Sequence, residues 1–223
     1  MKKIIAIGLA VSSIFFLTTS KVLAEWSAGV SANVGVYEAD GQEKEDGELN
    51  LATAEDAKFS HPSLFVEYNF GRVSIGLDVI PGSVTTEENS RTDMNIGDKG
   101  LATGNDGAGA GITNKVSVEL SRHVSLYALV PITDIGAFAR VQIMRMDVET
   151  NDSLGSGSIY PDTHMTGAAL SLGYQHDTGG AFVRAEVGYT DYDVISVKAS
   201  NTANTVTADV DGGWARISIG KTF

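Results

Sequence analysis

The sequence predicts an all-β protein, an eight-stranded antiparallel β-barrel that crosses a membrane, with short turns at one end and long loops at the other. Apolar and polar residues alternate with period two in eight segments, as in strands with one apolar face. The connections between these segments are alternately short and long. After residue 24 no apolar run approaches the roughly 20 residues of a membrane-spanning helix, so strands must make any crossing.

The first 24 residues have the composition of a secretory signal peptide. Lys2 and Lys3 give a positive start, and residues 4–17 are almost continuously apolar. Val22-Leu23-Ala24 then provides short side chains before an expected cleavage site. A retained helical anchor is the alternative, but this apolar run is short for a bilayer. We therefore expect a signal peptide over 1–24 and one barrel domain over 25–223.

The charge and the lack of cysteine exclude several functions. The formal net charge is −12, and removal of residues 1–24 would take three lysines and no acid with it. A chain this acidic is expected to repel nucleic acid. Without cysteine it forms no disulfide, has no thiolate chemistry and is not processed as a lipoprotein. We expect no cofactor and no resident metal.

The first three strands are expected at 26–37, 64–70 and 73–79. Every second residue from Trp26 to Val36 is apolar, and small or polar residues lie between them. The length suits a barrel strand, which needs about 9–11 residues to cross a bilayer. The same alternation runs from Leu64 to Phe70, and a tight Gly71-Arg72 turn leads into the third strand.

The fourth strand is expected to be long and uninterrupted, over 114–130. Its apolar residues share one parity from Val116 to Val130, although Ser121-Arg122-His123 could form a turn. Pro131 ends it, and residues 131–136 form a short turn.

The last four strands are expected to begin near residues 137, 168, 181 and 215. Residues 175–180 provide a short turn between the sixth and seventh. Before the eighth strand, the apolar residues of 206–210 have the opposite parity, and a β-bulge at Gly212-Gly213 would reconcile the two runs.

Loop lengths and aromatic residues orient the predicted barrel. Short turns fall at 71–72, 131–136 and 175–180, whereas long connections fall near 38–61, 80–114, 149–165 and 198–209. Outer-membrane barrels have short periplasmic turns and long extracellular loops. Aromatic belts mark membrane interfaces, and Tyr189 is a candidate for the outer belt. The predicted periplasmic belt consists of four lipid-facing aromatic residues: Trp26, Phe70, Tyr174 and Phe223.

The C-terminus carries a family resemblance. The ending Ile217-Ser-Ile-Gly-Lys-Thr-Phe223 closes a strand on a terminal Phe, and with the alternation and the signal peptide the chain resembles small Gram-negative outer-membrane β-barrels of the opacity/OmpX-like type. One departure is Lys221, where the family usually has an aromatic residue. The resemblance implies residence in the outer membrane, insertion by the assembly machinery that reads the C-terminal strand, and roles in adhesion, immune evasion or envelope integrity.

The inward-facing positions predict a charged lumen. An eight-stranded barrel is just wide enough for side chains to fill, and buried opposite charges must pair. A narrow ion or small-solute channel is the alternative; a soluble barrel with a greasy pocket is disfavoured by the polar inner face. The expected lumen network comprises four acids and three arginines: Glu67, Asp78, Glu119, Glu186, Arg140, Arg184 and Arg216.

Two arginines interrupt the lipid-facing rows of the fourth and fifth strands. Arg122 and Arg145 are about equally far from the 131–136 turn, so they are expected to be neighbours at the outer rim. Guanidinium groups match phosphate geometry, which predicts contact with lipopolysaccharide phosphates. Two side chains that only snorkel to the interface are the alternative.

Enzymatic alternatives are weaker. His123-Val124-Ser125 resembles the His-x-Ser of lipid A deacylase barrels, but no Glu lies between Ser125 and Glu149, and both residues have inward parity. A surface protease could use Asp191 or Asp193 with a histidine. The acidic segment 38–59 lacks EF-hand spacing and is expected to be a solvated loop rather than a calcium site. The sequence therefore favours a non-enzymatic barrel with a structural or surface-interaction role through acidic extracellular loops.

Overall fold

The computed structural model describes residues 25–45, 47–86, 88–93, 112–153 and 158–223, and all of its regular structure is β-strand. The expected signal peptide lies outside the described residues. The strands are β1 (Glu25–Glu45), β2 (Glu48–Phe70), β3 (Val73–Val79), β4 (Ser83–Thr85), β5 (Asn89–Asp93), β6 (Ile112–Pro131), β7 (Ala137–Ser153), β8 (Thr163–Thr178), β9 (Ala181–Tyr192), β10 (Ile195–Lys198) and β11 (Thr205–Thr222).

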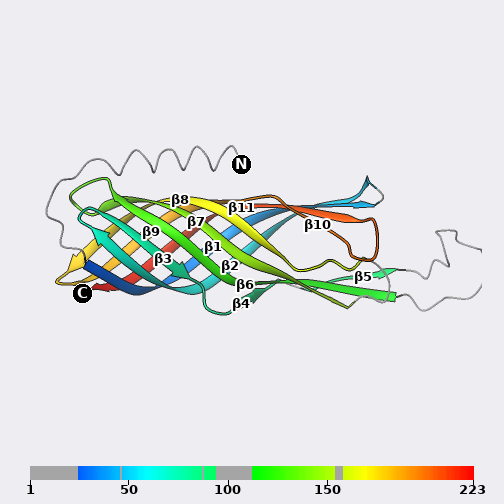
Figure 1. Ribbon diagram of the computed structural model, residues 1–223, viewed down its shortest axis with the longest axis horizontal. Coiled ribbons are helices and arrows are strands. Elements are labelled where there is room, and N and C mark those ends of the chain that lie inside the picture. The colour runs from blue at the N-terminus through cyan, green and yellow to red at the C-terminus, as the bar shows by residue number, and fades with distance from the viewer. Residues whose placement is uncertain (1–24, 46, 87, 94–111, 154–157) are drawn as a thin grey trace, which may run out of the picture.

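Eight of these strands close into a ring, as predicted. The order is β1-β2-β3-β6-β7-β8-β9-β11, and β11 pairs with β1 to complete the barrel (Figure 1). The closing pair is antiparallel and runs without a shift from Ser27↔Thr222 to Lys44↔Thr205. Closure matters in lipid, where an unpaired strand edge has no water to satisfy its N–H and C=O groups.

The wall follows the period of two predicted from the sequence. In β9, for example, Phe182, Arg184 and Glu186 are buried, whereas the alternate residues Val183, Ala185 and Val187 are exposed. The large exposed side chains are mainly Val, Ile, Leu and aromatic residues, and the buried polar ones include six charged and seven hydroxyl-bearing side chains. The barrel is therefore apolar outside and polar inside, the pattern required of a wall that faces lipid.

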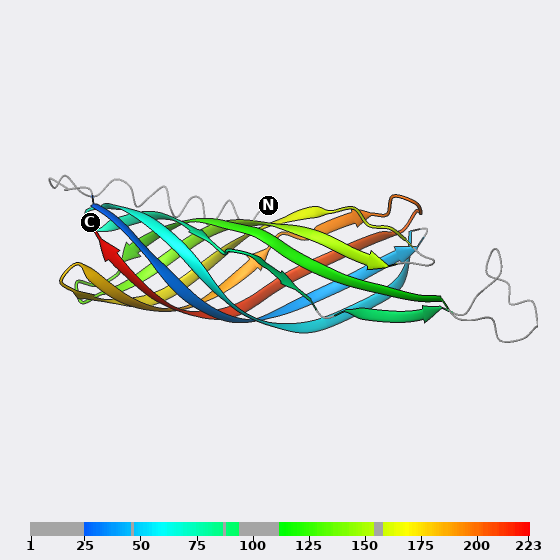
Figure 2. The same ribbon diagram turned by 90° about the horizontal axis from the view of Figure 1, so that it is seen from below.

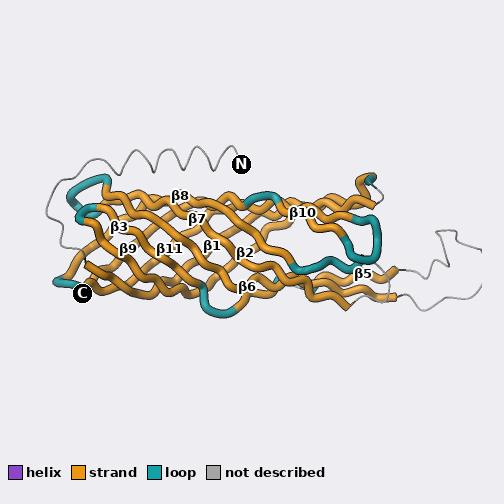
Figure 3. The backbone as a smooth tube through the Cα atoms, in the orientation of Figure 1, coloured by secondary structure: helices purple, strands orange, loops and turns teal. Residues whose placement is uncertain are grey.

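The two ends of the barrel differ. The start of β1 and the C-terminus lie at one end together with the turns β2–β3, β6–β7 and β8–β9, at the left of Figure 1. The longer connections and the strand extensions lie at the opposite end (Figure 3). By the usual orientation of these barrels, the first is the periplasmic end and the second the outer end.

The prediction of a loop over 38–61 was wrong, because these residues continue the strands. β1 and β2 remain paired up to Glu45↔Glu48, and β11 pairs with β1 as far as Lys44, so this long hairpin continues the barrel wall to its outer end (Figure 2). The sequence signal ended early because it depends on an apolar residue at every second position facing lipid, and beyond the membrane the outer face meets water. Backbone pairing continues there without that signal.

The other three predicted loops are also partly strand. β7 extends to Ser153, and β10 pairs with the start of β11 from Ile195↔Ala208 to Lys198↔Thr205. Beyond the end of β3, β4 and β5 take its place and pair with the outer part of β6. Residues 94–111, the middle of the predicted loop 80–114, lie outside the described residues.

The position of the bulge was predicted wrongly. β11 pairs with both β1 and β9 through Gly212 and Gly213 without a shift. The shift occurs in β6, where Ser121 lies opposite Asp147 and Val124 lies opposite Arg145, so that β6 contains one extra residue. Arg122 has a φ of 50°, a left-handed conformation uncommon outside glycine. The strand predicted as uninterrupted over 114–130 therefore changes face at Arg122–His123.

This bulge turns Leu120 and Leu126 to opposite sides, although they have the same parity. Leu120 packs against a buried interior cluster, whereas Leu126 is exposed on the lipid side. We expect a lipid-soluble thiol reagent to label Leu126→Cys in refolded protein and to spare both Leu120→Cys and the inward-facing Tyr127→Cys. Equal labelling at 120 and 126 would contradict the bulge.

Aromatic side chains inside the barrel each lie directly opposite a glycine on a neighbouring strand. A Cβ on these glycines would come within 2.3–2.7 Å of the facing ring. The glycines thus supply the space that the rings fill, as in the pairing of aromatic residues with strand glycines in designed sheets. The cross-strand pairs are Gly29–Phe65, Gly76–Tyr127, Gly173–Phe138, Gly220–Phe182, Gly188–Trp214, Gly167–Tyr192 and Gly212–Tyr37.

Candidate functional site: lumen network and outer rim

The lumen contains a buried bidentate ion pair between Glu67 of β2 and Arg184 of β9. Arg184 Nη1 donates to Glu67 Oε1 at 2.6 Å and Nη2 donates to Oε2 at 3.1 Å. Both side chains are only 2% exposed. The Tyr127 hydroxyl donates a further bond to Glu67 Oε1 at 2.7 Å, and Gln175 Oε1 accepts from Arg184. Bidentate hydrogen bonds of this kind offset the free-energy cost of removing both charges from water.

A second ion pair, Arg140–Glu186, joins the first through Tyr127. Arg140 Nη2 donates to Glu186 Oε1 at 2.9 Å, and Ser171 Oγ donates to Glu186 Oε2 at 3.2 Å. The Arg140 guanidinium also lies 3.9 Å from the centre of the Tyr127 ring. Tyr127 therefore bonds to the acid of one pair and stacks on the base of the other, which links four strands of the wall.

The third pair, Arg216–Asp78, is looser. Arg216 Nη1 lies 3.5 Å from Asp78 Oδ2, while Arg216 Nε donates to Asn33 Oδ1 at 2.5 Å. Ser63 Oγ donates to the same Asp78 oxygen at 3.1 Å. The three ion pairs together place six of the seven charged residues expected in the lumen on the inner wall.

Glu119 is the exception and corrects the prediction. It lies on the outer part of β6 opposite Glu149, and Asn151 Nδ2 donates to its Oε2 at 3.4 Å on the exposed side. The bulge at Arg122–His123 reverses the parity of β6, so Glu119 is not part of the lumen network.

Two apolar clusters pack against the ion pairs. Phe65, Tyr127, Leu129, Phe138 and Phe182 form a buried aromatic cluster among them, and the Arg184 guanidinium lies over three of its rings. Toward the outer end a second cluster contains three methionines and further apolar side chains. The members of this outer apolar layer are Met144, Met146, Val148, Met165, Ala169 and Tyr192, with Tyr37, Val118, Leu120, Ile195, Val210 and Trp214 packed against them.

Sequence reasoning missed the neutral partners in the lumen and the whole outer apolar layer. Tyr127 was assigned an inward parity, but nothing in the sequence indicated that it links two ion pairs. The opposite parity of Val206, Ala208 and Val210 was the available signal for the outer layer. The strand is regular there, and its apolar face turns inward because above the membrane the outer face is wet.

The four predicted belt aromatics are exposed and lie at the periplasmic end. Phe223 N donates to the backbone oxygen of Trp26 at 2.8 Å, so the two ends of the described chain are joined there. Tyr68, which was not predicted, packs against both Trp26 and Phe70 at centroid distances of 4.9 and 4.6 Å. Tyr174 lies opposite Ala137 at the start of β7.

Arg122 and Arg145 lie close together on the outer surface of β6 and β7. Arg122 Nη2 is 2.5 Å from Asp147 Oδ2 and Arg145 Nε is 3.9 Å from Asp147 Oδ1, so one carboxylate lies between the two guanidinium groups. Glu149 Oε1 is 3.8 Å from Arg122.

Two of the candidate catalytic residues lie on separate parts of the wall, because β7 and β8 lie between Ser125 of β6 and Asp193, which follows β9. Ser125 is buried on the lumen side of β6, and its hydroxyl faces the backbone oxygen of Asp78 at 3.5 Å. Asp193 accepts a bond from Thr166. Among the residues that the structure describes, no group of three or more His, Cys, Asp or Glu side chains is arranged to hold a metal ion.

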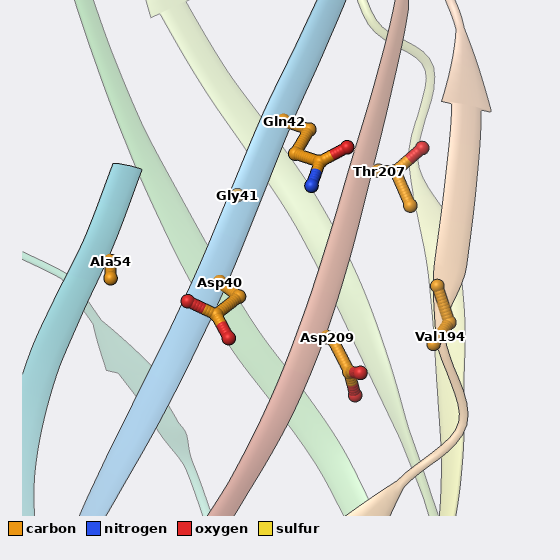
Figure 4. A pocket seen from close by; sticks show the side chains of 7 residues that line it. All are labelled: Asp40, Gly41, Gln42, Ala54, Val194, Thr207 and Asp209. Carbon is orange, nitrogen blue, oxygen red and sulfur yellow. The ribbon is translucent and has the colours of Figure 1, made fainter. Parts of the chain in front are cut away.

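A shallow acidic groove of about 560 Å³ lies on the outer surface between β1 and β11, with Asp40 and Asp209 directly opposite each other. Figure 4 shows these two carboxylates with Gln42 and Thr207 on the neighbouring strand segments. Ala54 and Val194 complete the lining. Carboxylates so placed repel each other and attract cations from solvent.

The fold and the lumen define the class of protein. A closed antiparallel ring of eight strands, apolar outside, charged inside and bordered by an aromatic belt, is a transmembrane β-barrel. Within the described residues no helix is long and apolar enough to cross a membrane. Residence in the Gram-negative outer membrane is what the resemblance of the chain's sequence implies for such a barrel.

Several solved outer-membrane proteins are similar to it. Neisserial surface protein A is 12% identical, with 88% of this chain and 99% of that chain covered and a TM-score of 0.39. The outer membrane protease OmpT from Escherichia coli is 10% identical, with 92% and 100% covered and a TM-score of 0.44. Ail of Yersinia pestis, solved with the heparin analogue sucrose octasulfate, is 14% identical, with 86% and 99% covered and a TM-score of 0.35.

No protein-family model and no curated protein sequence matches the chain. The similarities to solved structures are too distant to transfer an activity.

Proposed function

We propose that this protein is a non-enzymatic barrel with a plugged lumen that acts as a structural or surface-interaction protein of the outer membrane. The observation that carries the proposal is the filling of the lumen by packed side chains. The three ion pairs are interleaved with the aromatic cluster, and the outer apolar layer lies above both toward the outer end of the barrel. An eight-stranded barrel has no room for an open pore once such side chains fill it.

The outer end supports a role in contact with the surroundings. The β1–β2 hairpin reaches the outer end of the barrel, and its outward face carries acidic side chains. Glu38 lies directly opposite Asp56 on one side and Asp211 on the other, so carboxylates of three neighbouring strands line up at one height. Such a surface favours cationic partners through long-range attraction.

Cross-links between the outer segments give this surface a defined shape. The Tyr160 hydroxyl donates to Glu43 Oε1 at 2.8 Å, which ties the segment before β8 to β1. Ser200 N donates to the backbone oxygen of Ile159 at 2.8 Å, and Ile159 N donates to Asn201 Oδ1 at 2.8 Å. A surface that is ordered before binding loses less entropy when a partner docks.

The assembly machinery of the outer membrane is the partner proposed for the C-terminal strand. β11 ends next to the exposed Phe223, the residue that carries the family resemblance. Lys221 departs from the family pattern, but its ammonium lies 5.4 Å from the centre of the Phe223 ring, so it packs beside the terminal residue.

A conductance measurement tests the plugged lumen. Refolded protein in planar lipid bilayers is expected to show no reproducible conductance steps, because the packed ion pairs, aromatic cluster and outer apolar layer leave no continuous water path. A porin refolded into the same bilayers provides the positive control. Stable, ion-selective steps would contradict the proposal.

A narrow channel is the second candidate. Buried polar atoms without a hydrogen-bond partner in the described structure include His61 Nδ1, His123 Nδ1 and Asp78 Oδ1. Asp78 lies opposite Ser125, two residues from His123, and bonds to Ser63, two residues from His61, so these atoms lie at adjacent levels of the lumen. Conductance steps that disappear in Asp78→Asn would establish this candidate instead.

A further inference from the structure

Among the outward-facing charges of the barrel, Arg122 and Arg145 stand directly above apolar wall. Arg145 lies opposite Val124, and the next outward pair below is Leu126 opposite Ile143. Val124, Leu126 and Ile143 are exposed on the lipid-facing side. The two guanidinium groups therefore border the surface that acyl chains cover.

Their height matches the outer boundary of the membrane. Ala137, at the start of β7, lies opposite Tyr174 of the periplasmic belt. Arg145 lies eight residues after Ala137 on the same strand. At about 3.3 Å per residue and a tilt of roughly 40°, this distance is about 20 Å along the membrane normal, close to the top of an apolar band about 25 Å tall. A charge costs little there, and lipid phosphates lie at that level.

The bulge in β6 brings Arg122 to this position. The extra residue lies between Ser121, opposite Asp147, and Val124, opposite Arg145. It places Arg122 beside Arg145 in a left-handed backbone conformation that costs about 1 kcal/mol or more outside glycine. Strain of this kind persists where the surrounding strand pairing holds it, and it is a feature of binding sites.

The two guanidinium groups remain open to a ligand. Their side chains are 74% and 62% exposed, although Asp147 lies between them. Glu149, the second acid near Arg122, also accepts a bond from Ser121. Planar guanidinium groups bind phosphate oxygens in a two-point fashion that ammonium groups do not match.

We propose that Arg122 and Arg145 form a binding site for the phosphate of an outer-leaflet glycolipid, with Val124 and Ile143 below them in contact with its acyl chains. The inference rests on the proposed function, since it assumes a barrel embedded in the outer membrane. A lipid phosphate satisfies both parts of the site, the cationic pair and the apolar wall. A free phosphate ion satisfies only the first.

Native mass spectrometry of refolded full-length protein in zwitterionic detergent micelles tests this site. Titration with bisphosphorylated lipid A is expected to give one tightly bound lipid. Arg122→Gln and Arg145→Gln are each expected to weaken its binding about tenfold, the typical worth of a charged hydrogen bond. Dephosphorylated lipid A is expected to bind the unaltered protein as weakly as lipid A binds the variants.

The matched control is Lys58→Gln, which removes one exposed cation from the outward face of β2 without touching β6 or β7. It is expected to bind lipid A like the unaltered protein. If Lys58→Gln lost as much lipid A binding as the arginine variants, the effect would depend on net charge alone, which would contradict the proposed site. If millimolar inorganic phosphate displaced lipid A from the protein, the site would bind free anions, which would contradict its assignment to a lipid.

These outcomes are separate from the plugged lumen. Both arginines lie on the outer surface, so their variants are expected to leave the absence of conductance steps unchanged. Heat-modifiable migration in gels verifies that each variant has folded. A folded Arg122→Gln/Arg145→Gln double variant with unaltered lipid binding would refute the site and leave the proposed function standing.

Discussion

Replacing Arg184 with methionine is expected to lower the free energy of unfolding by about 3–5 kcal/mol, the cost of leaving a buried charge without its partner. Of the bonds described for Glu67, that from the Tyr127 hydroxyl would remain, and the carboxylate would be buried among the rings of the aromatic cluster. The loss is measured by urea unfolding in lipid vesicles, followed by tryptophan fluorescence.

The double variant Glu67→Gln/Arg184→Met tests the cause. It removes both charges, and it is expected to recover most of the loss, because replacing a whole buried pair is often nearly neutral. Arg72→Ala is the matched control: it removes an arginine from the exposed pair with Asp134 at the periplasmic turns and is expected to cost less than about 1 kcal/mol. Equal losses in Arg184→Met and Arg72→Ala would contradict a structural role for the lumen network.

The second large effect is expected from Gly212→Ala, with a loss of about 3 kcal/mol or failure to assemble. A Cβ at Gly212 would lie 2.4 Å from the Val36 backbone oxygen and 2.7 Å from Tyr37 Cα. Neither atom can move without breaking the β1–β11 pairing that closes the barrel, and overpacking of this kind costs about 1–3 kcal/mol or more.

Its neighbour in sequence supplies the control. Gly213 faces outward, and the nearest atom to a Cβ there is 3.9 Å away. Gly213→Ala is therefore expected to change the free energy of unfolding by less than about 0.5 kcal/mol. Urea unfolding and the yield of heat-modifiable protein distinguish the two. The reverse order of effects would mean that the facing of β11 is wrong, and equal effects would favour a bulge at this pair.

The part of the wall in lipid was predictable because one physical rule governs it. Trp26, Leu64 and Val187 face hydrocarbon, so alternation records their facing directly. Alternation gave wrong predictions in the outer parts of β1 and β6, where the strands leave the lipid. It ended β1 near Tyr37, although pairing continues to Glu45, and it carried Val118 outward, although the bulge at Arg122–His123 turns it inward.

The candidate site was predictable in composition but not in connection. Parity identified Glu67, Asp78, Glu186 and the three arginines as inward-facing. Which acid meets which arginine depends on the stagger of strands far apart in the sequence, since Glu67 and Arg184 are 117 residues apart. Strand register across a closed ring is a global property that no local pattern encodes.

The sequence by itself determined the class of structure: an eight-stranded barrel, its apolar outer face and the end at which Trp26 and Phe223 lie. It did so because a bilayer forces every spanning strand to show one apolar face and forces the strands to close into a ring. Only the tertiary structure decided the pairing inside the lumen, the bulge that places Arg122 beside Arg145 and the apolar layer at the outer end. These depend on register and on how side chains from opposite walls fill a shared interior, which becomes defined only when the barrel closes.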